Sequence, residues 1–162
     1  MRGGRGRPTV IAVPAGPVWG ERLRRALPGV WLGVLLAIAA IAAPSLFALL
    51  DRPSAGRVAA RLFALEAQAS LFFAVLLGLL ERRRAGARAV ARQGSVASFE
   101  LLLVLGALFC TVLGHYALQP MMETARAGAG RWSFGALHAV STALYGLKTL
   151  GVGVLAWRVS RF

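Results

Sequence analysis

Four long apolar runs alternate with short polar segments along the chain, at residues 30–50, 58–80, 99–118 and 134–157. Each run can cross a bilayer as a helix, because about 20 apolar residues span the hydrocarbon core. The first run follows a basic start, as in a signal peptide, but it is longer than a usual signal core. We therefore interpret it as an uncleaved transmembrane helix. The pattern predicts an all-α integral membrane four-helix bundle of up-down-up-down topology.

The segments outside these runs predict the domain organisation. Residues 1–16 are rich in Gly, Pro and Arg, a composition typical of disorder. Residues 17–29 can form a short interfacial helix, with apolar side chains towards lipid and arginines towards the head groups. We divide the chain into a basic, partly disordered N-terminal segment (1–28), a transmembrane domain (29–158) and a short cytoplasmic tail (159–162).

The links between the runs carry turn and capping signals. Residues 51–56 (DRPSAG) predict a short turn, residues 81–98 a basic loop, and residues 121–133 a loop that returns the chain to the fourth helix. Ser98 is a good N-cap for the third helix, and Glu100 in its first turn complements the helix dipole. These links are short enough for consecutive helices to be neighbours.

The charge of the chain changes what kind of partner is expected. The chain has 19 Lys and Arg against 6 Asp and Glu, a net charge of +13, which in a soluble protein would indicate nucleic acid. Here 57% of the residues are hydrophobic and the arginines lie mainly between the apolar runs. We therefore expect the bilayer and its anionic lipid head groups as partners, and no nucleic acid.

The distribution of arginine predicts an orientation. Basic residues concentrate in the N-terminal segment, the central loop and the C-terminus, and are fewer in the other two links. The positive-inside rule then places both termini in the cytoplasm, and the protein in the bacterial inner membrane. Cys110 is the single cysteine, so no intrachain disulfide can form.

Several short motifs resemble a known family. They are WLGVLLAIAAIAAPSLFALL in the first run, AGRVAARLF at the start of the second, QPMMETAR after the third, and FGALHAVSTALYGLK in the fourth. Over roughly residues 29–158 the chain resembles a bacterial family of four-helix membrane proteins of unknown function (DUF4149-type), related to the eukaryotic transmembrane-protein-205 proteins. The resemblance implies the fold and leaves the mechanism open. Where the family pattern often has an asparagine after Ser141, this chain has Tyr145 in the neighbourhood.

A stripe of polar residues runs along the fourth helix. His138, Ser141, Tyr145 and Lys148 share one helical face, and a lysine at that depth should face protein or a water-filled gap. Glu66 in the second helix lies at a depth that a lysine side chain can reach. An ion pair between Glu66 and Lys148 could tie the two helices together. A proton or cation relay along the stripe is the alternative function.

Two histidines are candidate metal ligands. His115 and His138 lie at a similar depth on the third and fourth helices, with Cys110, Met121 and Met122 as auxiliary ligands nearby. Imidazole with thioether or thiolate suits copper, and two imidazoles suit haem or zinc. The simpler interpretation is that each histidine forms a hydrogen bond to a neighbouring helix. We predict no cofactor, and keep copper or haem as the alternative.

No motif of an enzyme is present. The chain contains no P-loop, G-x-S-x-G, H-E-x-x-H or C-x-x-C, so we expect no catalytic residues. The sequence favours a small non-enzymatic accessory or scaffold subunit that acts through helix–helix contacts, with a membrane-protein partner or a second copy. The alternative is a small transporter or a metal- or haem-handling protein that uses the polar stripe and the histidine pair.

Overall fold

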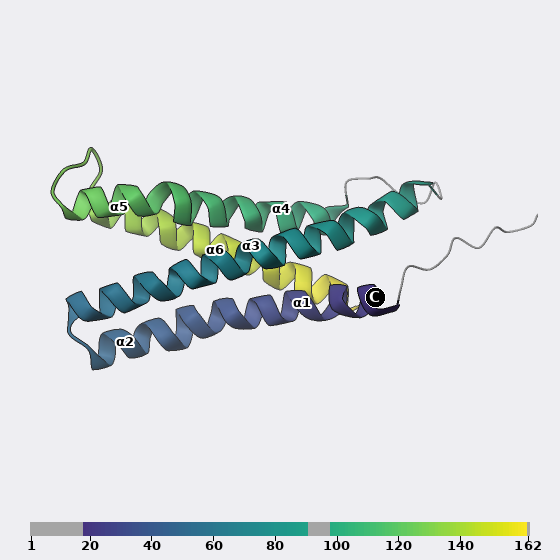
Figure 1. Cartoon of the computed structure of the whole chain (residues 1–162), viewed down its shortest axis with the longest axis horizontal. Coiled ribbons are helices and arrows are strands. Elements are labelled where there is room, and N and C mark those ends of the chain that lie inside the picture. The colour runs from purple at the N-terminus through teal and green to yellow at the C-terminus, as the bar shows by residue number, and fades with distance from the viewer. Residues whose placement is uncertain (1–17, 91–97, 162) are drawn as a thin grey trace, which may run out of the picture.

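The structure, a computed structural model, describes residues 18–90 and 98–161 (Figure 1). The elements are α1 (Val18–Leu36), η1 (Ala37–Ala42), α2 (Ala43–Leu49), α3 (Arg52–Val90), α4 (Phe99–Thr111), η2 (Val112–Ala117), α5 (Leu118–Arg126) and α6 (Phe134–Ser160). They form four long helical rods, each long and apolar enough to cross a membrane, and the described residues contain no strand. The predicted all-α four-helix membrane bundle is confirmed.

The helices are longer than the apolar runs that predicted them. The first helix begins at Val18 and continues through Pro28, so residues 18–29 are its first turns and not a separate interfacial helix. A proline is tolerated inside a membrane helix when neighbouring groups satisfy the freed backbone. The third rod likewise passes Pro120 and ends at Arg126. Residues 1–17, which include the segment 1–16 predicted to be disordered, lie outside the described residues.

The predicted turn at 51–56 is also shorter than expected. Helix α3 starts at Arg52, because Asp51 acts as its cap: Asp51 Oδ2 accepts a hydrogen bond from the Ser54 amide at 3.0 Å. That hydrogen bond lowers the pKa of the Asp51 carboxyl below its usual value. At its other end α3 continues to Val90, so the first half of the predicted basic loop is helical.

Two short π-helical segments, η1 and η2, interrupt the first and third rods. In η1 the amide of Ala43 donates to the carbonyl of Ile38, five residues earlier. Each π segment lies just before a proline, Pro44 or Pro120. A proline ring clashes with the carbonyl four residues before it, and a wider helical turn is one way to relieve that clash.

The four rods pack most tightly in one half of the bundle. There α1 contacts α3 and α6, and α4 contacts the same two helices. Small residues such as Ala74 and Ala107 allow close approach around a core of large apolar side chains. The core comprises Trp31, Leu35, Leu77, Val104, Val152, Leu155 and Val159. Large apolar residues elsewhere point outwards, as expected for a surface that faces lipid.

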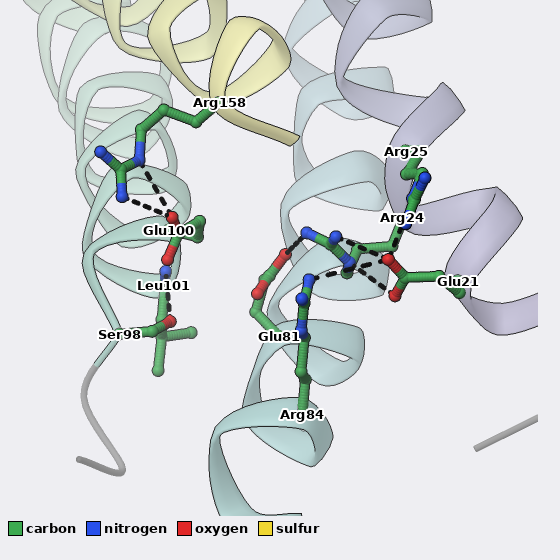
Figure 2. A network of polar contacts seen from close by, with 9 residues as sticks. All are labelled: Glu21, Arg24, Arg25, Glu81, Arg84, Ser98, Glu100, Leu101 and Arg158. Carbon is green, nitrogen blue, oxygen red and sulfur yellow. Dashed lines mark hydrogen bonds and ion pairs between the residues drawn. The ribbon is translucent and has the colours of Figure 1, made fainter. Parts of the chain in front are cut away.

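Ion pairs join the helices at the end of this packed half (Figure 2). Buried Arg24 of α1 pairs with Glu21 at 2.8 Å and with buried Glu81 of α3 at 3.1 Å. Arg158 of α6 pairs with Glu100 of α4 at 2.9 Å. Ser98 caps α4 as predicted, accepting from the Leu101 amide at 3.2 Å. The role predicted for Glu100 was therefore incomplete, because it also ties α4 to α6.

At the opposite end the rods diverge. Helix α6 runs towards α5, whereas α2 stays beside α3, as Figure 1 shows. A small cluster of Leu118, Met122 and Leu137 holds α5 against α6 there. The bundle thus has a packed half, which carries the ion pairs at its end, and an open half.

The packed half makes a testable prediction about stability. Leu155→Ala should lower the free energy of unfolding by about 2 kcal/mol, because it leaves a void beside Trp31. Lipid solvates leucine as well as the core does, so this cost reflects lost packing and not transfer from water. Denaturation of the detergent-solubilised protein, followed by circular dichroism, measures it. Leu150→Ala, at a side chain 70% exposed, is the control and should change little. Equal losses would mean that α6 is rotated relative to this structure.

Candidate functional site

The open half contains a partly open cavity of about 380 Å³. It lies between η1 and α2 on one side, α3 on the next, and α4, η2, α5 and α6 on the others. It extends from mid-depth towards the end of the bundle where the α2–α3 turn and the α5–α6 loop lie. Its volume is in the range of small-molecule sites in proteins.

The walls of this cavity differ in polarity. Glu66 is the one charged residue on the wall formed by η1, α2 and α3, which is otherwise composed of Ala39, Ala43, Phe47, Gly56, Ala59, Ala60, Phe63 and Ala67. The wall formed by α4, η2, α5 and α6 is mainly polar. It includes Cys110, Thr111, His115, Gln119, Arg126, His138, Ser141, Thr142, Tyr145 and Lys148. The predicted polar stripe of the fourth helix therefore lines a cavity, together with Glu66.

The inner end of the cavity is formed by the predicted contact between Glu66 and Lys148. Lys148 Nζ lies 2.8 Å from Glu66 Oε1 and 3.0 Å from Oε2, and both side chains are buried. The hydroxyl of Ser70 also donates to Glu66 Oε1. Ser70 in turn accepts a hydrogen bond from Trp31 Nε1 at 2.9 Å. The chain Lys148–Glu66–Ser70–Trp31 thus links α6, α3 and α1.

Sequence reasoning missed Ser70 and Trp31. The sequence contained a signal for Ser70 only. Ser70 follows Glu66 by one helical turn, so both side chains lie on one face of the helix. Trp31 lies within the first apolar run, and its side chain is fully buried. Its indole N–H needs a partner when buried, and Ser70 supplies one.

Tyr145 closes the inner end on the side of α1. Its hydroxyl donates to the backbone carbonyl of Leu35 at 2.9 Å, and its ring meets Phe63 edge-on at 5.4 Å between centroids. Lys148 Nζ lies 4.7 Å from the centre of the same ring, a cation–π contact. Tyr145 therefore joins α6 to the first rod at the boundary between the packed and open halves.

The outer part of the cavity holds the two histidines. The His138 ring stacks on Phe134 at 5.7 Å between centroids, and the guanidinium of Arg126 lies 4.6 Å from the centre of the Phe134 ring. The His115 ring contacts Tyr116 edge-on. In the described part of the chain, neither imidazole forms a hydrogen bond with a protein group. The simpler interpretation, a hydrogen bond from each histidine to a neighbouring helix, is therefore not what the structure shows.

The candidate metal ligands are only partly brought together. His115, His138, Cys110 and Met122 line the same cavity, whereas Met121 lines a separate hollow of about 230 Å³ beside Trp132. Within residues 18–90 and 98–161, no three His, Cys, Asp or Glu residues are grouped so that they could hold a metal ion. Binding of copper or haem by the histidine pair stays a prediction.

The buried pair leads to a prediction about coupling. Lys148→Met should lower the free energy of unfolding by about 3–5 kcal/mol, because it leaves the Glu66 carboxylate buried without a cation. The double change Glu66→Gln with Lys148→Met should cost less than Lys148→Met alone, and denaturant titrations of all variants would measure the difference.

A matched control is available at the end of the packed half. Glu100 and Arg158 also join two helices but are less buried, with side chains 17% and 40% exposed. The same substitutions there should show a coupling of at most about 1 kcal/mol. If the two single losses at Glu66 and Lys148 simply add, the pair does not hold the helices together.

Comparison with known proteins identifies the family of the chain. A family model described as "Domain of unknown function (DUF4149)" matches residues 26–131, which include Glu66 and His115, whereas the polar stripe of α6 lies beyond the match. No curated protein and no solved structure matches the chain. The relation to the transmembrane-protein-205 proteins stays a prediction from the resemblance. Because the match covers more than half of its length, the chain belongs to the DUF4149 family of proteins of unknown function.

Proposed function

We propose that this multi-pass membrane protein is a membrane-embedded binding protein of the carrier type, with the cavity of the open half as its ligand site. The observation that carries the proposal is the convergence of polar side chains from the third and fourth rods on a cavity closed at mid-depth. Polar and ionisable residues are costly inside a membrane, and they are usually functional.

The contacts of these side chains favour binding over a purely structural role. The Glu66–Lys148 pair already joins α3 to α6. The two histidines add no hydrogen bond between helices, and Thr142 bonds only to the carbonyl of His138 within its own helix. The imidazole nitrogens are thus left for whatever occupies the cavity, whereas the Thr142 hydroxyl has already used its one proton.

We also propose an orientation and a location for the protein. Among the described residues, Arg24, Arg25, Arg84 and Arg158 lie at the end that carries the ion pairs (Figure 2), and the positive-inside rule assigns that end to the cytoplasm of a bacterial inner membrane. The cavity would then be reached from the periplasmic side. The polar stripe would serve a ligand or a proton that arrives from outside the cell.

A binding test uses two glycine variants. Gly56 lines the cavity, and a Cβ added there meets no atom within 4 Å, so Gly56→Leu should add bulk at the cavity wall. Gly106→Leu makes the same change at an exposed position of α4 away from the cavity, where an added Cβ also meets no atom within 4 Å. Native mass spectrometry of protein transferred from membranes into nanodiscs should show a stoichiometric bound molecule in the parent and in Gly106→Leu, and its loss in Gly56→Leu.

Other results of the same experiment would contradict the proposal. An empty cavity in all three proteins together with a co-purifying membrane protein would favour the accessory or scaffold role. A bound molecule retained equally in Gly56→Leu would place the binding site elsewhere. Stoichiometric copper or haem lost in His115→Ala and His138→Ala would identify the ligand as a metal centre.

The orientation is tested by labelling single cysteines in a Cys110→Ser background. Arg82→Cys lies at the end with the ion pairs and Ala129→Cys in the α5–α6 loop, and both positions are exposed. A membrane-impermeant maleimide added to cells with a permeabilised outer membrane should label Ala129→Cys. It should label Arg82→Cys only after the inner membrane is opened. The reverse result would invert the protein in the membrane.

A further inference from the structure

We propose that the cavity receives the anionic head group of an amphiphile, which reaches it sideways from the bilayer through a gap between α2 and α6. This inference rests on the proposed binding function and names its ligand class. The alkyl chain of the ligand lies against the apolar wall and extends into lipid, while the head group lies beside Arg126 and His138.

The gap follows from how the first and fourth rods pack. In the packed half α1 contacts α6, but neither η1 nor α2 comes close to α6. The hydrogen bond from Tyr145 to the Leu35 carbonyl marks the place where this contact ends. Beyond it, α2 remains against α3 and α6 continues towards α5 (Figure 1). The cavity is therefore not closed by a helix–helix contact on this side.

The wall beside the gap is suited to hydrocarbon. Ala39, Ala43 and Phe47 follow one another at intervals of four residues, so they form one stripe along η1 and α2 that lines the cavity. Phe63 of α3 continues this wall. None of these side chains carries a polar atom, so the wall offers nothing to a wholly polar solute.

The opposite wall selects the charge of the head group. Arg126, His138 and His115 supply hydrogen-bond donors, whereas Glu66 is the one acid on the cavity and is already held by Lys148 and Ser70. Arg126 lies over the ring of Phe134, on which His138 also stacks, so both donors are positioned around the same ring. A guanidinium binds carboxylate and phosphate groups well. A cationic head group would find no free acid among the described residues that line the cavity.

The test uses dodecanoate with a diazirine in the middle of its chain, added to the protein in nanodiscs of phosphatidylcholine. Photolabelling should fall on peptides containing residues 39–47 and 138–145, which border the gap. Unlabelled dodecanoate and dodecyl phosphate should compete, and the stronger competitor identifies the head group as carboxylate or phosphate. Dodecylamine should not compete, and neither should butyrate, which lacks the chain.

Matched variants test both ends of the ligand. Arg126→Gln should weaken labelling about tenfold, the loss expected for one charge-assisted hydrogen bond, whereas Arg131→Gln removes an exposed arginine that does not line the cavity and should have no effect. Ala43→Trp should obstruct the gap and reduce labelling, whereas Ala48→Trp, at an exposed position of α2 that does not line the cavity, should not.

Several results would overturn the inference. They are equal labelling in Arg126→Gln and Arg131→Gln, competition by dodecylamine as strong as by dodecanoate, or competition by butyrate alone. A bound molecule that is lost in Gly56→Leu, combined with absence of photolabelling, would keep the binding function and exclude only the amphiphile. Absence of both a bound molecule and photolabelling would reject the two proposals together.

Discussion

The hydrogen-bonded chain Lys148–Glu66–Ser70–Trp31 is the interaction on which the rest of the bundle depends. In lipid there is no hydrophobic force to bring helices together, so packing and polar contacts between helices must do so. This chain satisfies a buried carboxylate with donors from two helices and joins three of the four rods near mid-depth. No buried side-chain nitrogen or oxygen of the described residues is left without a partner. Removing one member of this chain would leave a buried polar group without its partner. The chain therefore stabilises the bundle only when all four side chains are present.

The position of this chain divides the bundle into its two halves. On one side Trp31 carries the contact into the apolar core, where it lies among buried apolar side chains of all four rods. On the other side Lys148 and Glu66 face the cavity. The same ion pair thus lies where the core ends and the cavity begins. A ligand or a proton that reaches Lys148 would act directly on the contact that joins α3 to α6.

The sequence predicted the four helices, the Ser98 cap and the contact of Glu66 with Lys148, because these depend on local patterns and on depth. It did not predict the lengths of the helices. Residues 51–56 were interpreted as a turn and residues 121–133 as a loop, whereas Asp51 caps a helix that begins at Arg52 and α5 continues to Arg126. The similar depth of His115 and His138 suggested a shared site, whereas the partners Ser70 and Trp31 depend on the rotation of each helix about its axis. That rotation is set by packing between helices, which single-sequence periodicity does not determine.

The two ends of the bundle are held by contacts of different strength, and this difference explains how a cavity can coexist with a stable fold. At one end Arg24, Glu81, Glu100 and Arg158 fasten neighbouring helices through ion pairs. At the other end, Arg126 and His138 contact the ring of Phe134. Helix α2 there contacts only one of the other three rods, α3. The π turns η1 and η2 lie between these ends, where a helix bends most easily. None of the interhelical ion pairs named here involves α2 or α5, so the cavity is bordered by the two helices that these pairs do not fix.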